Sequence, residues 1–245
     1  MQAVTLPVES GSPTALLRLV GLLDLDSAVR VRSALHKALA DQPTAIIVDL
    51  AELRVGDDVM LTVFTAFAQT AAGWPGCAVL LCAAGPELAT ALDRVGVTRV
   101  LSVYPDRPQA LEAADRLPAP LRFDQPLPHA PGACAEARDA VRLACHQWTI
   151  VHLIDNAEIL VTELVANAVC HARGDLALSI VLRGRHLHVS VRDGTIEPPR
   201  LGQPDLFNGE GGRGLQLVDA IADGWGSLPT GKGKWVWATL RTRES

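Results

Sequence analysis

Apolar and polar residues repeat with two different periods along the first half of the chain, and each period predicts one kind of element. Short, nearly continuous apolar runs predict buried strands at 16–20, 45–50 and 78–82. Apolar residues that recur every three or four positions predict helices at 27–39, 58–72 and 86–95. We expect Asp26 to be the N-cap of the first helix. Strands and helices that alternate in this order predict an α/β layer with a parallel or mixed sheet.

A proline-rich stretch separates this half from the next. Five prolines lie from Leu117 to Pro131, a density that is incompatible with a helix interior or a central strand. We therefore predict that residues 117–131 are a linker or an edge strand. This places a first domain at 1–116 and a second domain at 132–245.

The second half predicts helices on one face of a mixed sheet. Alternating apolar residues predict a hairpin and a last strand, at 176–183, 187–191 and 234–240. Helical periodicity predicts three helices, at 136–148, after Asp155, and at 215–222. Asp155 and Glu158 have the spacing of a capping box, so we expect Asp155 to be the N-cap of the second of these helices.

That second helix carries three polar residues at intervals of four, Glu163, Asn167 and His171. At about 100° per residue, this spacing places them on one stripe beside an apolar face. A carboxylate and an amide on so apolar a helix need partners, because an unpaired buried polar group costs roughly 1–3 kcal/mol. A bound cation and a phosphate are suitable partners, and a polar edge that meets solvent is the alternative.

Two turns further along the chain add candidate chemistry. Asp193, Gly194 and Thr195 follow the predicted hairpin. Four glycines, at positions 209, 211, 212 and 214, lead into the helix at 215–222. Exposed backbone N–H groups at the start of a helix form an anion site that suits phosphate.

Two common nucleotide motifs fail on their context. Residues 209–214 match G-x-G-x-x-G, but no strand leads directly into them, and no acidic residue for a ribose lies about 20 positions later. Residues 226–232 resemble a P-loop, but Gly233 stands where Ser or Thr is required, and a strand follows in place of a helix. We exclude both motifs.

Composition and charge narrow the function classes. The chain of 245 residues is 49% hydrophobic and 20% charged, which is typical of a globular protein. A net charge of −5 argues against a nucleic-acid partner, and no apolar run approaches the ~20 residues of a membrane span. The five cysteines have neither metal-type nor disulfide-type spacing. We expect them to be small buried side chains of a cytoplasmic protein.

Residues 4–115 resemble a STAS domain, the fold of anti-sigma-factor antagonists, in the runs LVGLLDLDSAVRVRSALHKAL and AIIVDLAEL and in the segment that ends with VYPD. The family has a phosphoacceptor serine at the start of the helix after the second core strand. This chain has Gly56, Asp57 and Asp58 there, and the nearest hydroxyl group is that of Thr62. Two interpretations remain: one of the aspartates is an N-cap, or Asp58 partly mimics a phosphoserine. Either way, we expect a fixed binding surface.

Residues 122–241 resemble the GHKL ATPase family, which includes histidine kinases, gyrase and anti-sigma-factor serine kinases. The segments similar to its N, G1 and G2 boxes are 163–172, 191–194 and 211–215. Together they are similar to the serine-kinase (RsbW-like) branch. The resemblance implies the Bergerat α/β sandwich, with ATP and Mg²⁺ as cofactors. The G1 box departs from the family pattern because it lacks the second glycine.

The resemblance and the side-chain chemistry together imply a role for each residue. Glu163 is expected to be the catalytic base, and Asn167 the metal ligand for Mg²⁺. Asp193 would accept the amino group of adenine, and Gly194 would let the backbone approach the base. The phosphates are expected to lie against Gly211, Gly212, Arg213, Gly214 and Leu215.

Other polar residues have weaker assignments. His171 either contacts phosphate or has a structural role. Lys232 or Lys234 is a minor candidate for a phosphate contact. His186 and His188 alternate on one strand, and we expect them to be surface residues.

Two functions fit these expectations. The first is a protein serine/threonine kinase that phosphorylates a STAS-domain anti-anti-sigma protein and sequesters a sigma factor. The second is an ATP-dependent binding regulator whose fused STAS domain occupies the partner surface. A homodimer is expected in either case. A histidine kinase is excluded, because no long two-helix hairpin presents a phosphoacceptor histidine.

Overall fold

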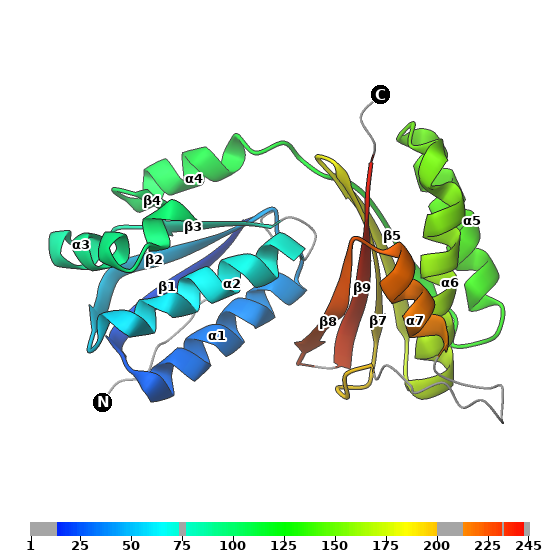
Figure 1. Ribbon diagram of the computed structural model, residues 1–245, viewed down its shortest axis with the longest axis horizontal. Helices are drawn as coiled ribbons and strands as arrows, with labels where there is room; N and C mark the ends of the chain where they lie inside the picture. The colour runs from blue at the N-terminus through cyan, green and yellow to red at the C-terminus, as the bar shows by residue number, and fades with distance from the viewer. Residues whose placement is uncertain (1–13, 74–76, 200–212, 232, 243–245) are drawn as a thin grey trace. The chain divides into compact units, whose positions relative to one another are not determined.

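The computed structural model describes residues 14–73, 77–199, 213–231 and 233–242. The chain divides into two compact units, with the division between Ala119 and Pro120. Each unit has its own sheet and its own helices (Figure 1).

The sheet of the first unit is parallel throughout. Its strands follow the order β1-β2-β3-β4, and each strand pairs in parallel with the next. Nearly continuous apolar runs give these strands two apolar faces, as is usual for a parallel sheet that is covered on both sides. The strands are β1 (Thr14–Leu23), β2 (Ala45–Val55), β3 (Ala78–Cys82) and β4 (Ser102–Tyr104).

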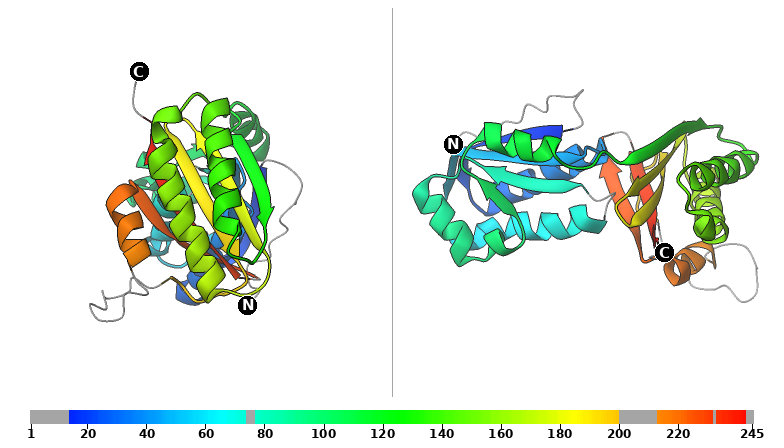
Figure 2. Two further views of the ribbon diagram at one scale, coloured as in Figure 1. Left: turned by 90° about the vertical axis from the view of Figure 1, so that its right-hand side faces the viewer. Right: turned by 90° about the horizontal axis from the view of Figure 1, so that it is seen from above.

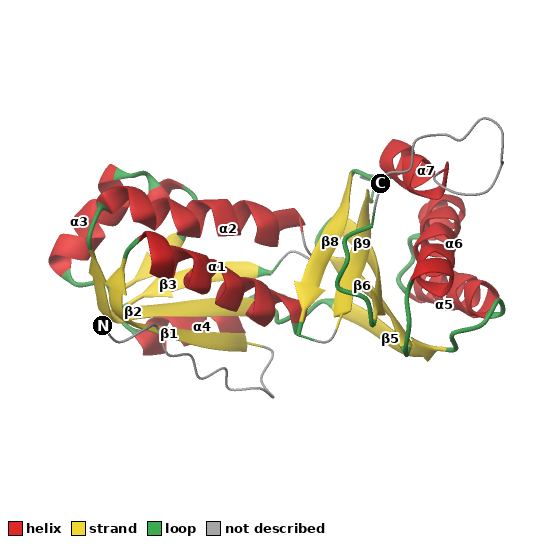
Figure 3. Cartoon of the chain, turned by 90° about the horizontal axis from the view of Figure 1, so that it is seen from below, coloured by secondary structure: helices red, strands yellow, loops and turns green. Residues whose placement is uncertain are grey.

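Helices cover both faces of this sheet (Figures 1 and 3). Helices α1 and α2 pack against each other and on β1 and β3, and α4 packs on β2, β3 and β4. Ile47 and Leu80 form a buried cluster with Ala110 of α4. The helices are α1 (Leu25–Ala40), α2 (Thr62–Gly73), α3 (Pro86–Arg94) and α4 (Arg107–Asp115), with short 3₁₀ turns η1 (Asp58–Leu61) and η2 (Val97–Arg99).

The three strands and three helices predicted for this unit are confirmed, but the predicted cap is wrong. Helix α1 begins two residues earlier than expected, and Asp24 is its N-cap. The Asp24 carboxylate accepts from Ser27 N at 2.9 Å, while the Ser27 hydroxyl accepts from Asp24 N at 2.7 Å. Asp26 lies exposed in the first turn. Ser27 takes the third helical position of this capping box, where Glu or Gln is usual.

The sheet of the second unit is antiparallel in all its described pairs, so the predicted mixed sheet is wrong. The strand order is β5-β6-β7-β9-β8. The hairpin and the last strand are where the alternation predicted them. The strands are β5 (Leu121–Leu127), β6 (Leu176–Arg183), β7 (His186–Asp193), β8 (Gly224–Thr230) and β9 (Gly233–Arg241).

Helices α5, α6 and α7 lie together on one face of this sheet (Figure 2). Leu160, Leu164 and Ala168 of α6 pack in one buried core with Val189 and Val191 of β7. The helices are α5 (Ala133–Gln147), α6 (Ile154–His171) and α7 (Arg213–Ile221), with a 3₁₀ turn η3 (Val151–Leu153).

The predicted capping box of α6 is wrong. A 3₁₀ turn leads directly into the helix, so the N-cap is Leu153, which makes no side-chain cap hydrogen bond. Asp155 lies in the first turn instead. Glu158 forms an ion pair with Arg142 of α5, with Nη2 and Oε1 2.6 Å apart. Asp155 and Glu158 have the spacing of a capping box. The 3₁₀ turn places Leu153 at the N-cap position, however, so Asp155 is already inside the helix.

Strand β5 lies inside the stretch predicted to be a linker or an edge strand. It pairs only with β6 in the described sheet, and it contains Pro126. An edge strand tolerates a proline because its outer side makes no ladder hydrogen bonds. Strand β8 was not predicted. Its glycines obscure the strand pattern, and Gly226 leaves room for the ring of Trp237.

Two burial predictions are corrected. His188 is buried, at 3% exposure. Burial lowers the pKa of His188 to about 3, since the charged form loses its hydration. Cys170 is exposed, whereas Cys77, Cys82 and Cys145 are buried as expected. None of the helices in the described part of the chain has the length and apolar character needed to cross a membrane.

The α1 cap gives a prediction with a matched control. Asp24→Ala should lower the midpoint of urea unfolding, because Ser27 N loses its acceptor, whereas Asp26→Ala should leave it nearly unchanged. The hydrogen bond from Ser27 N lowers the pKa of Asp24. The stabilisation is therefore fully present above about pH 3.9, the unfolded value, and is lost as the pH falls through the folded pKa.

Urea titrations of the three proteins, followed by circular dichroism at pH 7 and at pH 3, measure this difference. An equal decrease of the unfolding midpoint in Asp24→Ala and Asp26→Ala at pH 7 would contradict the assignment of Asp24 as the N-cap.

Candidate functional site

The polar stripe of α6 lies beside the buried apolar face of the helix, on the side that meets α7. Glu163 and Asn167 are partly buried, and His171 is exposed at the last residue of the helix. The residues beside them, Leu164 and Val165, are fully buried. The packing of these apolar residues in the core sets the orientation of α6, and the orientation of α6 sets the direction of the polar stripe.

Glu163 lies against the first turn of α7. A Cβ atom placed on Gly214 would overlap Glu163 Oε2, so the carboxylate passes over a residue that has no side chain. Helix α6 also packs against α7, β7 and β9 (Figure 1). A carboxylate at a helix N-terminus interacts favourably with the helix dipole.

The phosphate cradle predicted around this turn is partly described. Gly214 is partly buried and Leu215 is buried in α7. Arg213 is the first residue of α7, and its side chain is outside the described part of the structure. Gly211 and Gly212 also lie outside the described residues.

Asp193 is the last residue of β7, and its carboxylate is fully buried. Lys234 faces it from β9, with its ammonium group 3.0 Å from Oδ1 and 2.8 Å from Oδ2. Thr195 N donates to Oδ1 at 2.8 Å, and the Lys234 ammonium group donates to Thr195 O at 3.2 Å. Lys234 therefore contacts the acidic turn, and its minor candidacy as a phosphate ligand stays a prediction. Lys232 lies outside the described residues.

Two glycines allow the backbone to close around Asp193. Gly194 N donates to Arg173 O at 3.1 Å, and a Cβ atom on Gly194 would overlap that carbonyl oxygen. Gly233 has a φ of 149°, and a Cβ atom there would overlap the carbonyl oxygen of Asp193. Only glycine fits such close backbone approaches.

His129 fixes the end of α6 beside this turn, a contact that sequence analysis did not find. Its ring nitrogens lie 2.9 Å from Val169 O and 3.0 Å from Gly174 O. Both partners are acceptors, so the imidazolium form, with two donors, suits them best. The carbonyl of Val169, and then that of Gly174, raises the pKa of His129. No local sequence pattern marks this contact, because it joins residues about 40 positions apart.

The arrangement contains a buried carboxylate, that of Asp193, and a partly buried amide, that of Asn167. Asp193 Oδ2 is buried and accepts no hydrogen bond from the described residues. Asn167 lies four residues from Glu163 on the same stripe and is partly buried. No group of three or more His, Cys, Asp and Glu side chains among the described residues is able to hold a metal ion. A cation at Asn167 would therefore take most of its ligands from a bound molecule.

Comparison with known protein families gives a match for each unit. A family model of the histidine kinase-like ATPase domain matches residues 127–240, and a model of the STAS domain matches residues 6–110. The chain joins a STAS domain to a histidine kinase-like ATPase domain. Both resemblances seen in the sequence are confirmed at this level. The match to the ATPase domain implies ATP binding by the second domain.

Several of the solved structures similar to the chain are anti-sigma-factor antagonists. One, from Mycobacterium paratuberculosis, has 24% identity and a TM-score of 0.40, with 46% of this chain and 95% of that chain covered. Unphosphorylated SpoIIAA has 17% identity and a TM-score of 0.40, with 48% of this chain and 100% of that chain covered. None of the curated proteins compared with the chain matches it.

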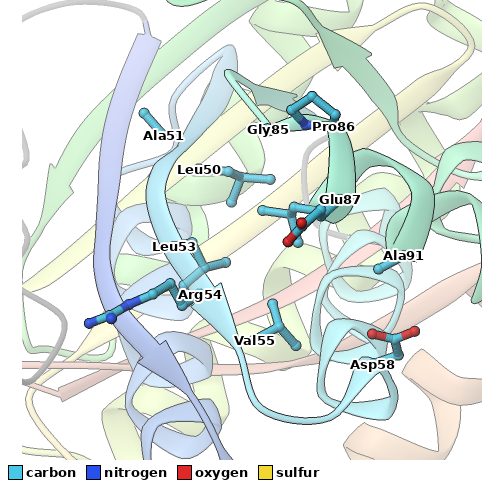
Figure 4. Close-up of a pocket in the computed structure, with 11 residues that line it drawn as sticks. Leu50, Ala51, Leu53, Arg54, Val55, Asp58, Gly85, Pro86, Glu87 and Ala91 are labelled. Carbon is cyan, nitrogen blue, oxygen red and sulfur yellow. The ribbon is translucent and has the colours of Figure 1, made fainter.

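The STAS domain has a cavity of about 670 Å³ between the end of β2 and the start of α3 (Figure 4). Leu53, Val55 and Leu88 contribute apolar walls, and Asp58 lies at its edge. Asp58 forms an ion pair with Arg94, 2.5 Å apart.

Asp57 and Asp58 had two interpretations, an N-cap or, for Asp58, a partial mimic of phosphoserine. The structure decides the role of Asp57. Its carboxylate caps η1 by accepting from Val59 N at 2.9 Å, so the N-cap interpretation holds for Asp57. The hydroxyl group of Thr62 donates to Val59 O at 2.6 Å.

The closure at Asp193 gives a second prediction. Gly233→Ala should destabilise the ATPase domain by roughly 1–3 kcal/mol, because the new Cβ atom meets the Asp193 carbonyl and the φ value is strained. Gly231→Ala is the matched control, since its Cβ atom would meet nothing within 4 Å. It should change stability by no more than about 0.5 kcal/mol.

Urea unfolding followed by the fluorescence of the β8 and β9 tryptophans measures both variants. Equal stability of Gly233→Ala and Gly231→Ala would mean that the backbone closure is not tight.

Proposed function

We propose that the protein is an ATP-dependent protein serine/threonine kinase of anti-sigma-factor type, which transfers phosphate to a serine of a separate STAS-domain protein. A STAS domain joined to a histidine kinase-like ATPase domain suggests a regulator of anti-sigma-factor type, which supports the proposal. The observation that carries the proposal is the position of Glu163. Its carboxylate lies at the first turn of α7, one helical turn from Asn167, on the same side of α6.

Asn167 is proposed to hold the cation. Its amide oxygen is a hard ligand of the kind that Mg²⁺ prefers, and a single protein ligand suits an ion that keeps waters and phosphate oxygens. Mg²⁺ would neutralise charge on the β- and γ-phosphates during transfer.

Glu163 is proposed to accept the proton of the incoming serine. The serine oxygen forms a bond to the γ-phosphorus, the bond from that phosphorus to the β–γ bridging oxygen breaks, and ADP leaves with the electron pair. The serine proton passes to the Glu163 carboxylate. The first turn of α7, which lies against Glu163, would hold the phosphates with its backbone N–H groups.

Asp193 is proposed to hold adenine. Its Oδ2 atom is a buried acceptor without a hydrogen bond from the described residues, and the amino group of adenine is a donor. Gly194 is proposed to lie beside the base, with its backbone held by the hydrogen bond that it donates to Arg173 O. His171 is exposed at the end of α6, where contact with a phosphate remains a proposal.

A second function is favoured by the STAS domain of this chain. It has Asp57 and Asp58 where the family places its phosphoacceptor serine, and the Thr62 hydroxyl is engaged with Val59 O. The ATPase domain therefore has no evident acceptor in its own chain. In this alternative, nucleotide only sets the conformation, and the fused STAS domain occupies the partner surface. STAS domains interact with sigma-factor regulatory partners. A sigma factor and a second copy of the chain are further proposed partners.

Transfer itself tests the proposal. Full-length protein with Mg-ATP should phosphorylate a serine-bearing STAS protein from the same cell, as detected by phosphoserine mass spectrometry. Glu163→Gln should slow the transfer by about 10²–10⁴-fold, because the general base is lost. Glu158→Gln is the control on the same helix, since Glu158 pairs with Arg142 instead.

Phosphate transfer at the wild-type rate by Glu163→Gln would contradict the role of Glu163 as the general base. Tight ATP binding with no transfer by the wild type would support the binding regulator.

Asn167→Ala tests the cation site separately from the chemistry. ATP with Mg²⁺ should raise the melting temperature of the wild type more than ATP with EDTA, and the variant should lose this difference. Asn156→Ala, an exposed asparagine on the same helix, should behave like the wild type. A Mg²⁺-dependent shift that survives in Asn167→Ala would contradict the metal role.

A further inference from the structure

The pair formed by Asp193 and Lys234 lies on the helix-covered face of the second sheet. The two residues are direct partners in the β7–β9 ladder. Along β7, Val191 belongs to the buried core, and Asp193 continues the same face. Along β9, Val236 belongs to that core, and Lys234 continues it in the same way. Because side chains alternate along a strand, both charged groups point into the helix layer.

The pair is buried but not saturated. Asp193 is 2% exposed and Lys234 is 4% exposed. The ammonium group donates hydrogen bonds to Asp193 Oδ1 and to Thr195 O, and it has three N–H donors. It lies 2.8 Å from Oδ2, but out of line for a hydrogen bond, so Oδ2 accepts none from the described residues. One donor and one acceptor are therefore left side by side.

Stability does not explain this arrangement. Burying an ion pair costs desolvation that often exceeds the Coulombic gain, and apolar residues of similar size frequently serve as well. A buried carboxylate oxygen without a donor adds a further cost. A structural ion pair in an apolar core would be expected to satisfy both oxygens. An unfilled donor beside an unfilled acceptor indicates a ligand that presents the opposite pair.

We propose that Lys234 reads the nucleotide base together with Asp193, by donating to the ring nitrogen N1 of adenine while Asp193 accepts from its 6-amino group. The proposal rests on the nucleotide site proposed above. Adenine presents a donor and an unprotonated ring nitrogen on adjacent atoms, which complements the pair. A 6-oxopurine presents the reverse order, with a carbonyl oxygen toward the carboxylate and an N–H group toward the ammonium group. Lys234 thereby selects adenine over guanine and hypoxanthine.

A merely structural Lys234 makes a different prediction. It would hold Asp193 in place, and its loss would weaken every nucleotide to the same extent. A base-reading Lys234 instead discriminates between bases that differ only at N1. The ratio of two affinities therefore separates the roles, even if the variant is less stable.

The test uses the full chain and isothermal titration with three Mg-nucleotides. These are ATP, 1-deaza-ATP, which lacks N1, and purine riboside triphosphate, which lacks the 6-amino group. The wild type should bind each analogue about tenfold or more weakly than ATP, since each loses a hydrogen bond to a charged group. In Lys234→Met the preference for ATP over 1-deaza-ATP should disappear, and the preference over purine riboside triphosphate should persist. Lys234→Arg, which keeps a donor, should retain part of the N1 preference.

Lys234→Met leaves the Asp193 carboxylate buried without its counterion, which destabilises the protein. A second variant, which also removes the carboxylate, is therefore included. Asp193→Asn with Lys234→Met removes both charges, and it should bind ATP and 1-deaza-ATP with similar affinity. Equal affinity of the wild type for ATP and 1-deaza-ATP would overturn the proposal without any variant. The proposal is also overturned if Lys234→Met keeps the wild-type ratio of the affinities for ATP and 1-deaza-ATP. If the wild type binds no ATP, the proposed function itself fails, which is a distinct result.

Discussion

The candidate site depends on how closely the end of β7 is held by its neighbours. Gly233 approaches the Asp193 carbonyl from β9, and Arg173 accepts a hydrogen bond from Gly194 on the other side. Between these contacts the Asp193 side chain has one direction, inward, and Lys234 meets it there. A group held on three sides needs no rearrangement to receive a ligand, which is the advantage of a preorganised site.

The helix layer places the remaining chemistry relative to this fixed point. The apolar face of α6 packs on β7 and β9, so the stripe of Glu163 and Asn167 faces the start of α7. His129 links the last turn of α6 to the chain at Gly174, and the next residue back, Arg173, contacts Gly194. The same chain of contacts thus connects the acidic turn with the helix that carries the polar stripe.

Local periodicity predicted most elements of both domains, because apolar spacing directly reports which face of an element is buried. It also predicted that Glu163 and Asn167 share a stripe. It failed where contacts between distant segments decide the outcome. Asp26 and Asp24 are equally plausible caps in sequence, and only the entry of the chain into α1 selects Asp24. Lys234 has no local mark as a partner of Asp193, since the two are 41 positions apart. Strand β8 was missed because its glycines do not give a strand pattern. Gly226 is explained only by its contact with the Trp237 ring of the neighbouring strand, which the local sequence does not show.

A crystal structure of the full chain with Mg²⁺ and a non-hydrolysable ATP analogue tests the central claim most directly. The account predicts that the adenine amino group lies within hydrogen-bond distance of Asp193 Oδ2 and that the metal ion contacts the amide oxygen of Asn167. A nucleotide bound in the cavity of the STAS domain, or one in the ATPase domain whose base does not contact Asp193, would contradict it.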